Sequence, residues 1–114
     1  MLKQRRAAAE KVAAQLFAVE AGVDAAISQV AQLTTAIIEA RSEAKLSAFV
    51  GQAEVALATR AAALMIEARQ LILDTHTQLA QTRIDIGLRE VSWGDSTNDC
   101  PPVASTAGTL RAVA

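Results

Sequence analysis

The stretch Arg41-Ser-Glu-Ala-Lys-Leu-Ser47 separates two long alanine-rich segments and decides how the chain folds. Glu39 and Glu43 are a like-charged pair at i,i+4, which in a continuous helix would repel by roughly 0.2–0.5 kcal/mol. Ser42 or Ser47 could cap the start of a new helix with its hydroxyl. We therefore predict a turn over about 42–47, between helices of about 3–41 and about 47–86.

The alternative is one uninterrupted helical rod, because neither glycine nor proline forces a turn between residues 41 and 47. The two segments have nearly equal lengths, which favours two antiparallel helices. The predicted fold class is all-α: a long two-helix hairpin over residues 1–90, with an extended, mostly irregular C-terminal arm over 91–114.

Apolar residues in the first segment recur every seven positions, which is typical of a long helix that packs along a narrow seam. One series is Leu2, Ala9, Leu16, Val23, Val30 and Ile37, and the second is Val12, Val19, Ala26, Leu33 and Ala40. Gly22 interrupts neither series, and we expect it to mark a close approach of the two helices.

The second segment carries a comparable apolar stripe with steps of three and four residues. Its members are Leu46, Val50, Ala53, Leu57, Ala61, Leu64, Ala68, Leu71, Thr75, Leu79, Thr82 and Ile86. Gly87 suits the left-handed position that ends a helix, and Leu88 suits the apolar contact that accompanies it. Other apolar residues, including Met65 and Ile66, lie off the stripe, so one neighbouring helix cannot cover them all.

Composition predicts a thin core. Of the 114 residues 52 % are hydrophobic, but many are alanine, tyrosine is absent, and Phe17, Phe49 and Trp93 are the only aromatic residues. Two alanine-rich helices bury too little apolar area to offset chain entropy of roughly 1–2 kcal/mol per residue. We therefore expect homo-oligomerisation or packing with other proteins of an assembly. The helix-interface residues that we predict are Leu16, Val19, Val23, Val30, Leu33, Ile37, Val50, Leu57, Leu64, Leu71 and Leu79.

The chain begins with a short basic segment, although its net charge is only −1. Lys3, Arg5, Arg6 and Lys11 are candidate contacts for an anionic partner. No aromatic residues alternate with these cations, and no second basic cluster lies nearby in sequence. The pattern therefore favours a solvated helix start over a nucleic-acid site.

No motif for catalysis, metal binding or phosphate binding is present, so we expect neither an enzyme nor a cofactor. His76 has no acidic or metal-ligating neighbour at helical spacing, and Cys100 is the single cysteine. The uncharged run 25–38 is short and polar for a bilayer, so we expect no membrane span. No export signal is evident, which predicts cytoplasmic synthesis, with a larger particle as a possible destination.

The arm is polar around residues 96–108 and apolar again at its end, and we expect Trp93, Leu110 and Val113 to anchor it on a neighbour. A basic start, a helical hairpin and an arm with an apolar tip resemble in layout the small structural proteins of large assemblies such as virions. The sequence thus predicts a non-enzymatic structural or assembly protein. The alternative is a small helical regulatory adaptor, or a nucleic-acid-associated dimer that uses the basic N-terminus.

Overall fold

A computed structural model describes residues 1–88 of the protein, and these contain two helices and no strand. Helix α1 spans Leu2–Glu43 and helix α2 spans Gln52–Asp85. The chain divides into two compact units: unit 1 consists of Met1–Leu16 and Thr75–Ala114, and unit 2 of Phe17–Asp74. The predicted anchors Trp93, Leu110 and Val113, and Cys100, lie outside the described residues.

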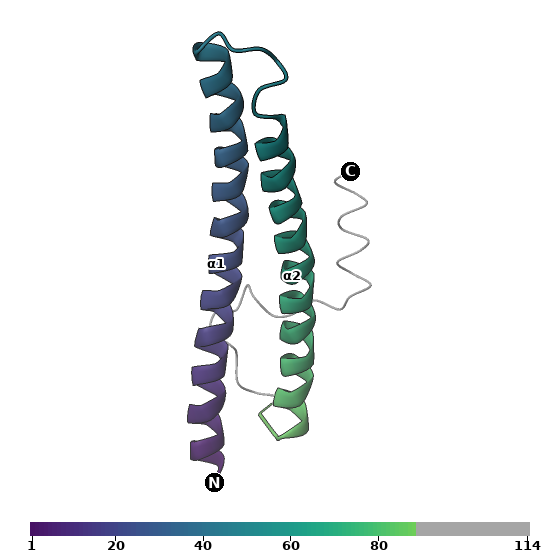
Figure 1. Cartoon of the computed structure of the whole chain (residues 1–114). Coiled ribbons are helices and arrows are strands. Elements are labelled where there is room, and N and C mark those ends of the chain that lie inside the picture. Colours follow the sequence, from purple (N-terminus) through teal and green to yellow (C-terminus); the bar gives the residue numbers. More distant parts are fainter. Residues whose placement is uncertain (89–114) are drawn as a thin grey trace, which may run out of the picture. The chain divides into compact units, whose positions relative to one another are not determined.

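Unit 2 contains the turn of the hairpin. Its two helical parts lie side by side and run in opposite directions, joined by residues 44–51 (Figure 1). Arg69 Nε donates a hydrogen bond to Asp24 Oδ1 at 2.7 Å, which joins the two helices near the middle of each. The predicted hairpin is therefore confirmed, and the alternative of one uninterrupted rod is wrong.

Helix α1 ends in a Schellman motif, in which the amides after the helix bond back to its last carbonyls. The amide of Lys45 donates to the carbonyl of Ser42 at 3.0 Å, and that of Leu46 to the carbonyl of Arg41 at 3.1 Å. Lys45 takes the left-handed conformation this requires, with φ 56°. The turn thus begins after Glu43, two residues beyond the predicted helix end, because the repulsion of Glu39 and Glu43 is weaker than one turn of hydrogen bonds.

Helix α2 starts at Gln52 rather than at Ser47. The hydroxyl of Ser47 does accept a hydrogen bond, from the amide of Phe49 at 3.2 Å, but this stabilises a turn in the connection. The first helical hydrogen bond of α2 joins the amide of Val55 to the carbonyl of Gly51 at 2.9 Å, so Gly51 is the N-cap. Gly51 has φ +89°, and a Cβ there would lie 3.3 Å from Ile37 Cγ2.

Unit 1 pairs the start of α1 with the end of α2. A second Schellman motif ends α2 in this unit, and Gly87 takes the left-handed conformation with φ +86°. The amide of Gly87 donates to the carbonyl of Ile84 at 3.0 Å, and the amide of Leu88 donates to the carbonyl of Arg83 at 2.9 Å. Leu88 is 3 % exposed. The predicted cap at Gly87 is therefore confirmed, and Leu88 is buried.

The seam between the helices follows a strict alternation of four and three residues along α1. The less exposed α1 residues at this spacing are Ala9, Ala13 and Leu16 in unit 1, and Glu20, Val23, Ile27, Val30, Thr34, Ile37 and Arg41 in unit 2. The predicted series through Leu16, Val23 and Ile37 thus lies in the seam. The second predicted series is wrong as a seam, because its place is taken by residues one position later.

Polar residues can occupy this seam because its edges remain open to water. Thr34 is partly buried, and its hydroxyl donates to the carbonyl of Val30 at 3.1 Å, one turn earlier. Val12 and Leu33, by contrast, are 44 % and 53 % exposed. The second predicted series, which includes Val12 and Leu33, is more apolar than the series one position later, but the later series lies in the seam.

Three alanine substitutions test the backbone assignments. Gly51→Ala and Gly87→Ala should each lower the free energy of unfolding by about 1–2 kcal/mol, because both positions have positive φ. The loss should be greater for Gly51→Ala, whose Cβ also meets Ile37. Thermal and urea unfolding followed by circular dichroism measure the change.

Gly22→Ala is the matched control. A Cβ at Gly22 meets nothing within 4 Å, so the expected close approach of the helices there is wrong. Alanine should stabilise this exposed helical position by about 1 kcal/mol. A destabilised Gly22→Ala, or an unchanged Gly51→Ala, would contradict the assigned geometry.

Candidate functional site

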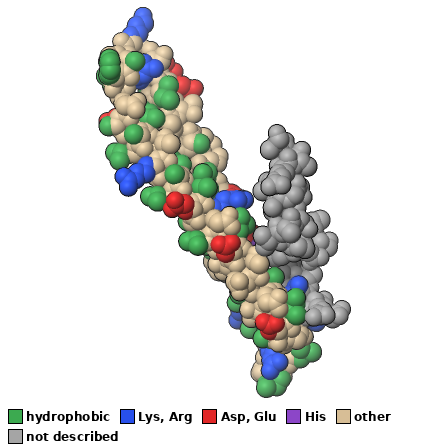
Figure 2. Space-filling model, turned by 90° about the vertical axis from the view of Figure 1, so that its right-hand side faces the viewer, with side chains coloured by type: hydrophobic (Ala, Val, Ile, Leu, Met, Phe, Trp, Pro, Cys, Tyr) green, Lys and Arg blue, Asp and Glu red, His purple; other side chains and the backbone are tan. Residues whose placement is uncertain are grey.

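The candidate site is a surface formed by apolar side chains that the hairpin leaves exposed. Hydrophobic side chains recur on the face drawn in Figure 2, among polar, basic and acidic ones. Within the described part of the chain, the buried hydrophobic residues are Ala13, Leu16 and Leu88. Thirteen large hydrophobic residues are exposed there: Met1, Leu2, Val12, Leu33, Ile38, Leu46, Phe49, Val50, Leu57, Leu64, Ile66, Leu71 and Ile86.

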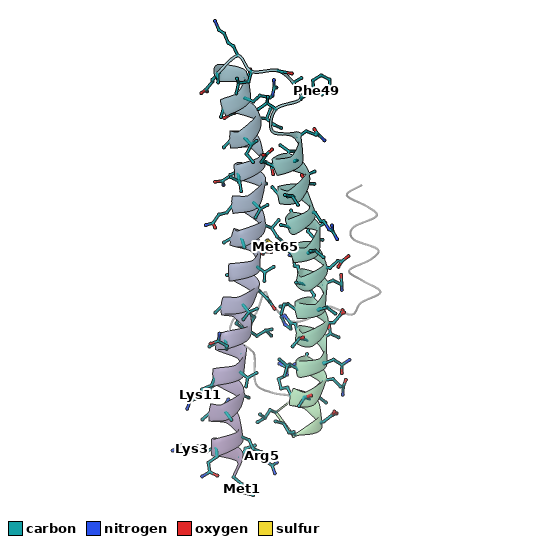
Figure 3. The ribbon with its side chains drawn as sticks, in the orientation of Figure 1. Met1, Lys3, Arg5, Lys11, Phe49 and Met65 are labelled. Atoms are coloured by element: carbon teal, nitrogen blue, oxygen red, sulfur yellow. The ribbon has the colours of Figure 1, made fainter. Side chains whose placement is uncertain are left out.

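Helix α2 does not turn its predicted stripe toward α1. In unit 2 the less exposed α2 residues are Val55, Ala58, Ala61, Ala62, Met65, Ile72 and Leu73. Figure 3 shows Met65 between the two helices. Leu57, Leu64 and Leu71 are 68 %, 57 % and 66 % exposed. In unit 2 a second apolar face of α2 therefore takes most of the less exposed positions, and these three leucines lie on the surface.

The exposed face has its own order, and we name it the outer stripe: Leu57, Ala61, Leu64, Ala68 and Leu71. Successive members are three or four residues apart, so they share one side of α2. All are exposed except Ala61, which is partly buried. Leucine and alanine alternate along the stripe, which gives it a regular sequence of large and small side chains.

Charged residues border the outer stripe on one side. These are Arg60, Glu67 and Asp74, each seven residues from the next and each exposed. Gln70 Nε2 donates to Asp74 Oδ1 at 2.9 Å, which orients that carboxylate. The other border of the stripe is the seam with α1. An apolar line with charges along its border is the pattern of a helix that pairs with another helix.

The remaining predicted interface residues divide between seam and surface. Leu16 is buried, and Val19, Val23, Val30, Ile37 and Leu79 are partly buried. Leu33 and Val50 are exposed, as is Phe49 in the connection, which is 91 % exposed (Figure 3). Ala58 and Ala62 are seam residues that were not predicted from the sequence. The pattern that could have indicated them is their spacing of three residues from Val55 and Met65, respectively.

The basic N-terminal residues differ in their surroundings. Arg5 Nη1 donates to the carbonyl of Ile86 at 3.4 Å, at the C-terminal end of α2, where a cation is favourable. Arg6 lies 4.0 Å from Glu10. Lys3 and Lys11 are exposed and point away from α2 (Figure 3). Arg5 and Arg6 therefore have intramolecular partners, which does not favour a site for an anionic ligand.

Candidate chemistry is sparse over residues 1–88. No group of three or more His, Cys, Asp or Glu side chains gathers there to hold a metal ion. His76 is partly buried in unit 1 on the side of α2 that carries Leu79. By length and composition α1 could cross a membrane, a property shared by signal sequences and by core helices of soluble proteins. The absence of a membrane span stays a prediction.

Comparison with known proteins adds no relative: no protein-family model, no curated protein and no solved structure matches the chain.

A pair of substitutions on α1 tests which residues form the seam. Ile37→Ala should lower the free energy of unfolding by about 1–2 kcal/mol, because it removes apolar area packed beside Gly51. Leu33→Ala should change it by less than about 0.5 kcal/mol, because Leu33 is 53 % exposed. Urea unfolding of dilute protein measures both. Equal losses would contradict the seam assignment.

Proposed function

We propose that the protein is a non-enzymatic structural or assembly protein that associates with copies of itself, or with other proteins of a larger complex, through its exposed helix faces. The observation that supports this is the imbalance between three buried and thirteen exposed hydrophobic residues in the described part of the chain. Soluble monomers seldom present extended apolar surface of this kind without using it for binding.

The small stabilisation that the hairpin gains from its own contacts also supports association. Apolar area removed from water contributes roughly 25 cal/mol per Å², and the seam of unit 2 is built partly from alanines and polar residues. The ion pair of Asp24 with Arg69 is about half exposed on both sides and contributes at most about 1 kcal/mol. Association is the available way for such a hairpin to bury more apolar area.

The proposal includes a role for residues 91–114. The exposed apolar surface of the helices would then be one contact of the assembly, and Trp93, Leu110 and Val113 would supply another on a neighbouring subunit. Particle size should depend on both. These two contributions are separable by experiment, because the outer stripe and the arm lie in different parts of the sequence.

The native mass as a function of concentration tests the proposal. Light scattering and sedimentation velocity should give a mass above 11.9 kDa at micromolar concentration, with dissociation on dilution. A monomer at all concentrations up to the millimolar range would overturn self-association. A monomer that enters a larger species only with a purified partner would support the second form of the proposal, in which other proteins complete the assembly.

Deletion of residues 96–114 tests the arm. Helicity measured by circular dichroism should be retained, since α1 and α2 end before this segment. The mass of the largest species should fall, because one intersubunit contact is lost. The matched control replaces the same residues with a Gly/Ser sequence of equal length. An unchanged particle mass in both variants would contradict the role of the arm.

A further inference from the structure

The outer stripe of α2 is complementary to itself when two copies run in opposite directions. Positions 61 and 71 share the midpoint 66, and so do positions 64 and 68. A two-fold axis near residue 66 would therefore bring each leucine of these pairs opposite an alanine of the other copy. Such isologous contacts are the commonest way in which identical chains associate.

We propose that a second copy of this chain docks on the outer stripe, α2 against α2, antiparallel, with the two-fold axis near residue 66. This proposal rests on the self-association proposed above and specifies its surface, its partner and its register. Leu64 packs against Ala68 of the second copy, and Ala61 against Leu71 of the second copy.

Side-chain size favours this arrangement over a parallel one. In a parallel pair each residue faces its own equivalent, so Leu64 would meet Leu64 and Ala68 would meet Ala68. Leucine–leucine layers would then alternate with alanine–alanine layers, and the alanine–alanine layers would leave voids. In the antiparallel register each layer from position 61 to position 71 of the stripe contains one leucine and one alanine, which permits close packing at constant helix separation.

Charge favours the same register. Positions 60 and 74 share the midpoint 67, next to the axis, so Arg60 of each copy lies beside Asp74 of the other. The pair forms twice, once on each side of the axis. Gln70 Nε2 donates a hydrogen bond to Asp74 Oδ1 at 2.9 Å, which helps to hold this exposed carboxylate at the border of the stripe. In a parallel pair Arg60 would lie across from apolar residues of the seam.

The proposed register brings two carboxylates of like charge together, which opposes association. Glu67 lies next to the axis and would face Glu67 of the second copy. Glu67→Gln should therefore tighten the dimer by roughly two- to fivefold. An unchanged or weakened dimer would overturn the register.

Two glutamate substitutions test the surface. Leu64→Glu should raise the dissociation constant about 100-fold or more, since it places two carboxylates in the buried layers of the dimer. Ile66→Glu is the matched control: Ile66 is 56 % exposed, close to the 57 % of Leu64, but it lies on another side of α2. Sedimentation velocity on the full chain should show unchanged association for Ile66→Glu. Circular dichroism at high concentration checks that both variants remain helical.

Charge reversal tests the direction of the helices. Arg60→Asp alone and Asp74→Arg alone should each weaken the dimer roughly three- to tenfold, because like charges then meet on both sides of the axis. The double variant should recover the affinity of the parent. Additive weakening in the double variant would overturn the register.

Distances between single labels separate this proposal from other forms of association. Each variant carries one labelled cysteine per copy in a Cys100→Ser background. Along the helix direction, the two labels of the dimer should be about 9 Å apart for Ala63→Cys and about 30 Å apart for Ala56→Cys, at ~1.5 Å per residue. Equal distances at both sites would indicate a parallel pair and overturn the proposal. If the parent associates but Leu64→Glu associates equally well, this surface is wrong and self-association stands. A monomeric parent would overturn both.

Discussion

A two-helix hairpin can bury only one face of each helix, and in this protein that face is built partly from alanines and polar residues. The rest of the structure follows from this limit. Ala13 and Leu16 are the buried residues of α1, and within α2 as described every residue is at least partly exposed. The larger side chains, among them Leu57, Leu64 and Leu71, lie on the surface instead.

The helix ends show how the chain compensates locally. Both helices terminate in Schellman motifs, so the carbonyls at each C-terminus have partners independent of any apolar core. Gly87 adopts the left-handed conformation readily, whereas Lys45 does so at some cost in backbone strain. Gly51 permits the return of the chain close to Ile37. The turn is thus defined by backbone hydrogen bonding more than by apolar contacts.

Part of this architecture could be predicted from the sequence, namely the two helices, their antiparallel pairing and the cap at Gly87 and Leu88. These depend on local chemistry and on periodicity. The seam was harder, because alanine-rich helices present more than one apolar series at heptad spacing. Leu33 and Leu57 are the larger side chains of their series and are exposed, whereas the smaller Thr34 and Ala58, one position later, are partly buried. Gly51 was not predicted as part of the turn, because it lies within the span 47–86 that was expected to be helical.

The same surplus of apolar faces connects the fold to the proposed role. A helix that was selected only to complete a hairpin would need one apolar line, and α2 has two, with Arg60, Glu67 and Asp74 along the border of the outer one. The central claim is that this hairpin depends on association for its stability. The midpoint of thermal unfolding, measured over a 100-fold range of protein concentration, tests the claim most directly. We predict a rise of about 5–10 °C with concentration, and a midpoint independent of concentration would contradict a dependence of the hairpin on association.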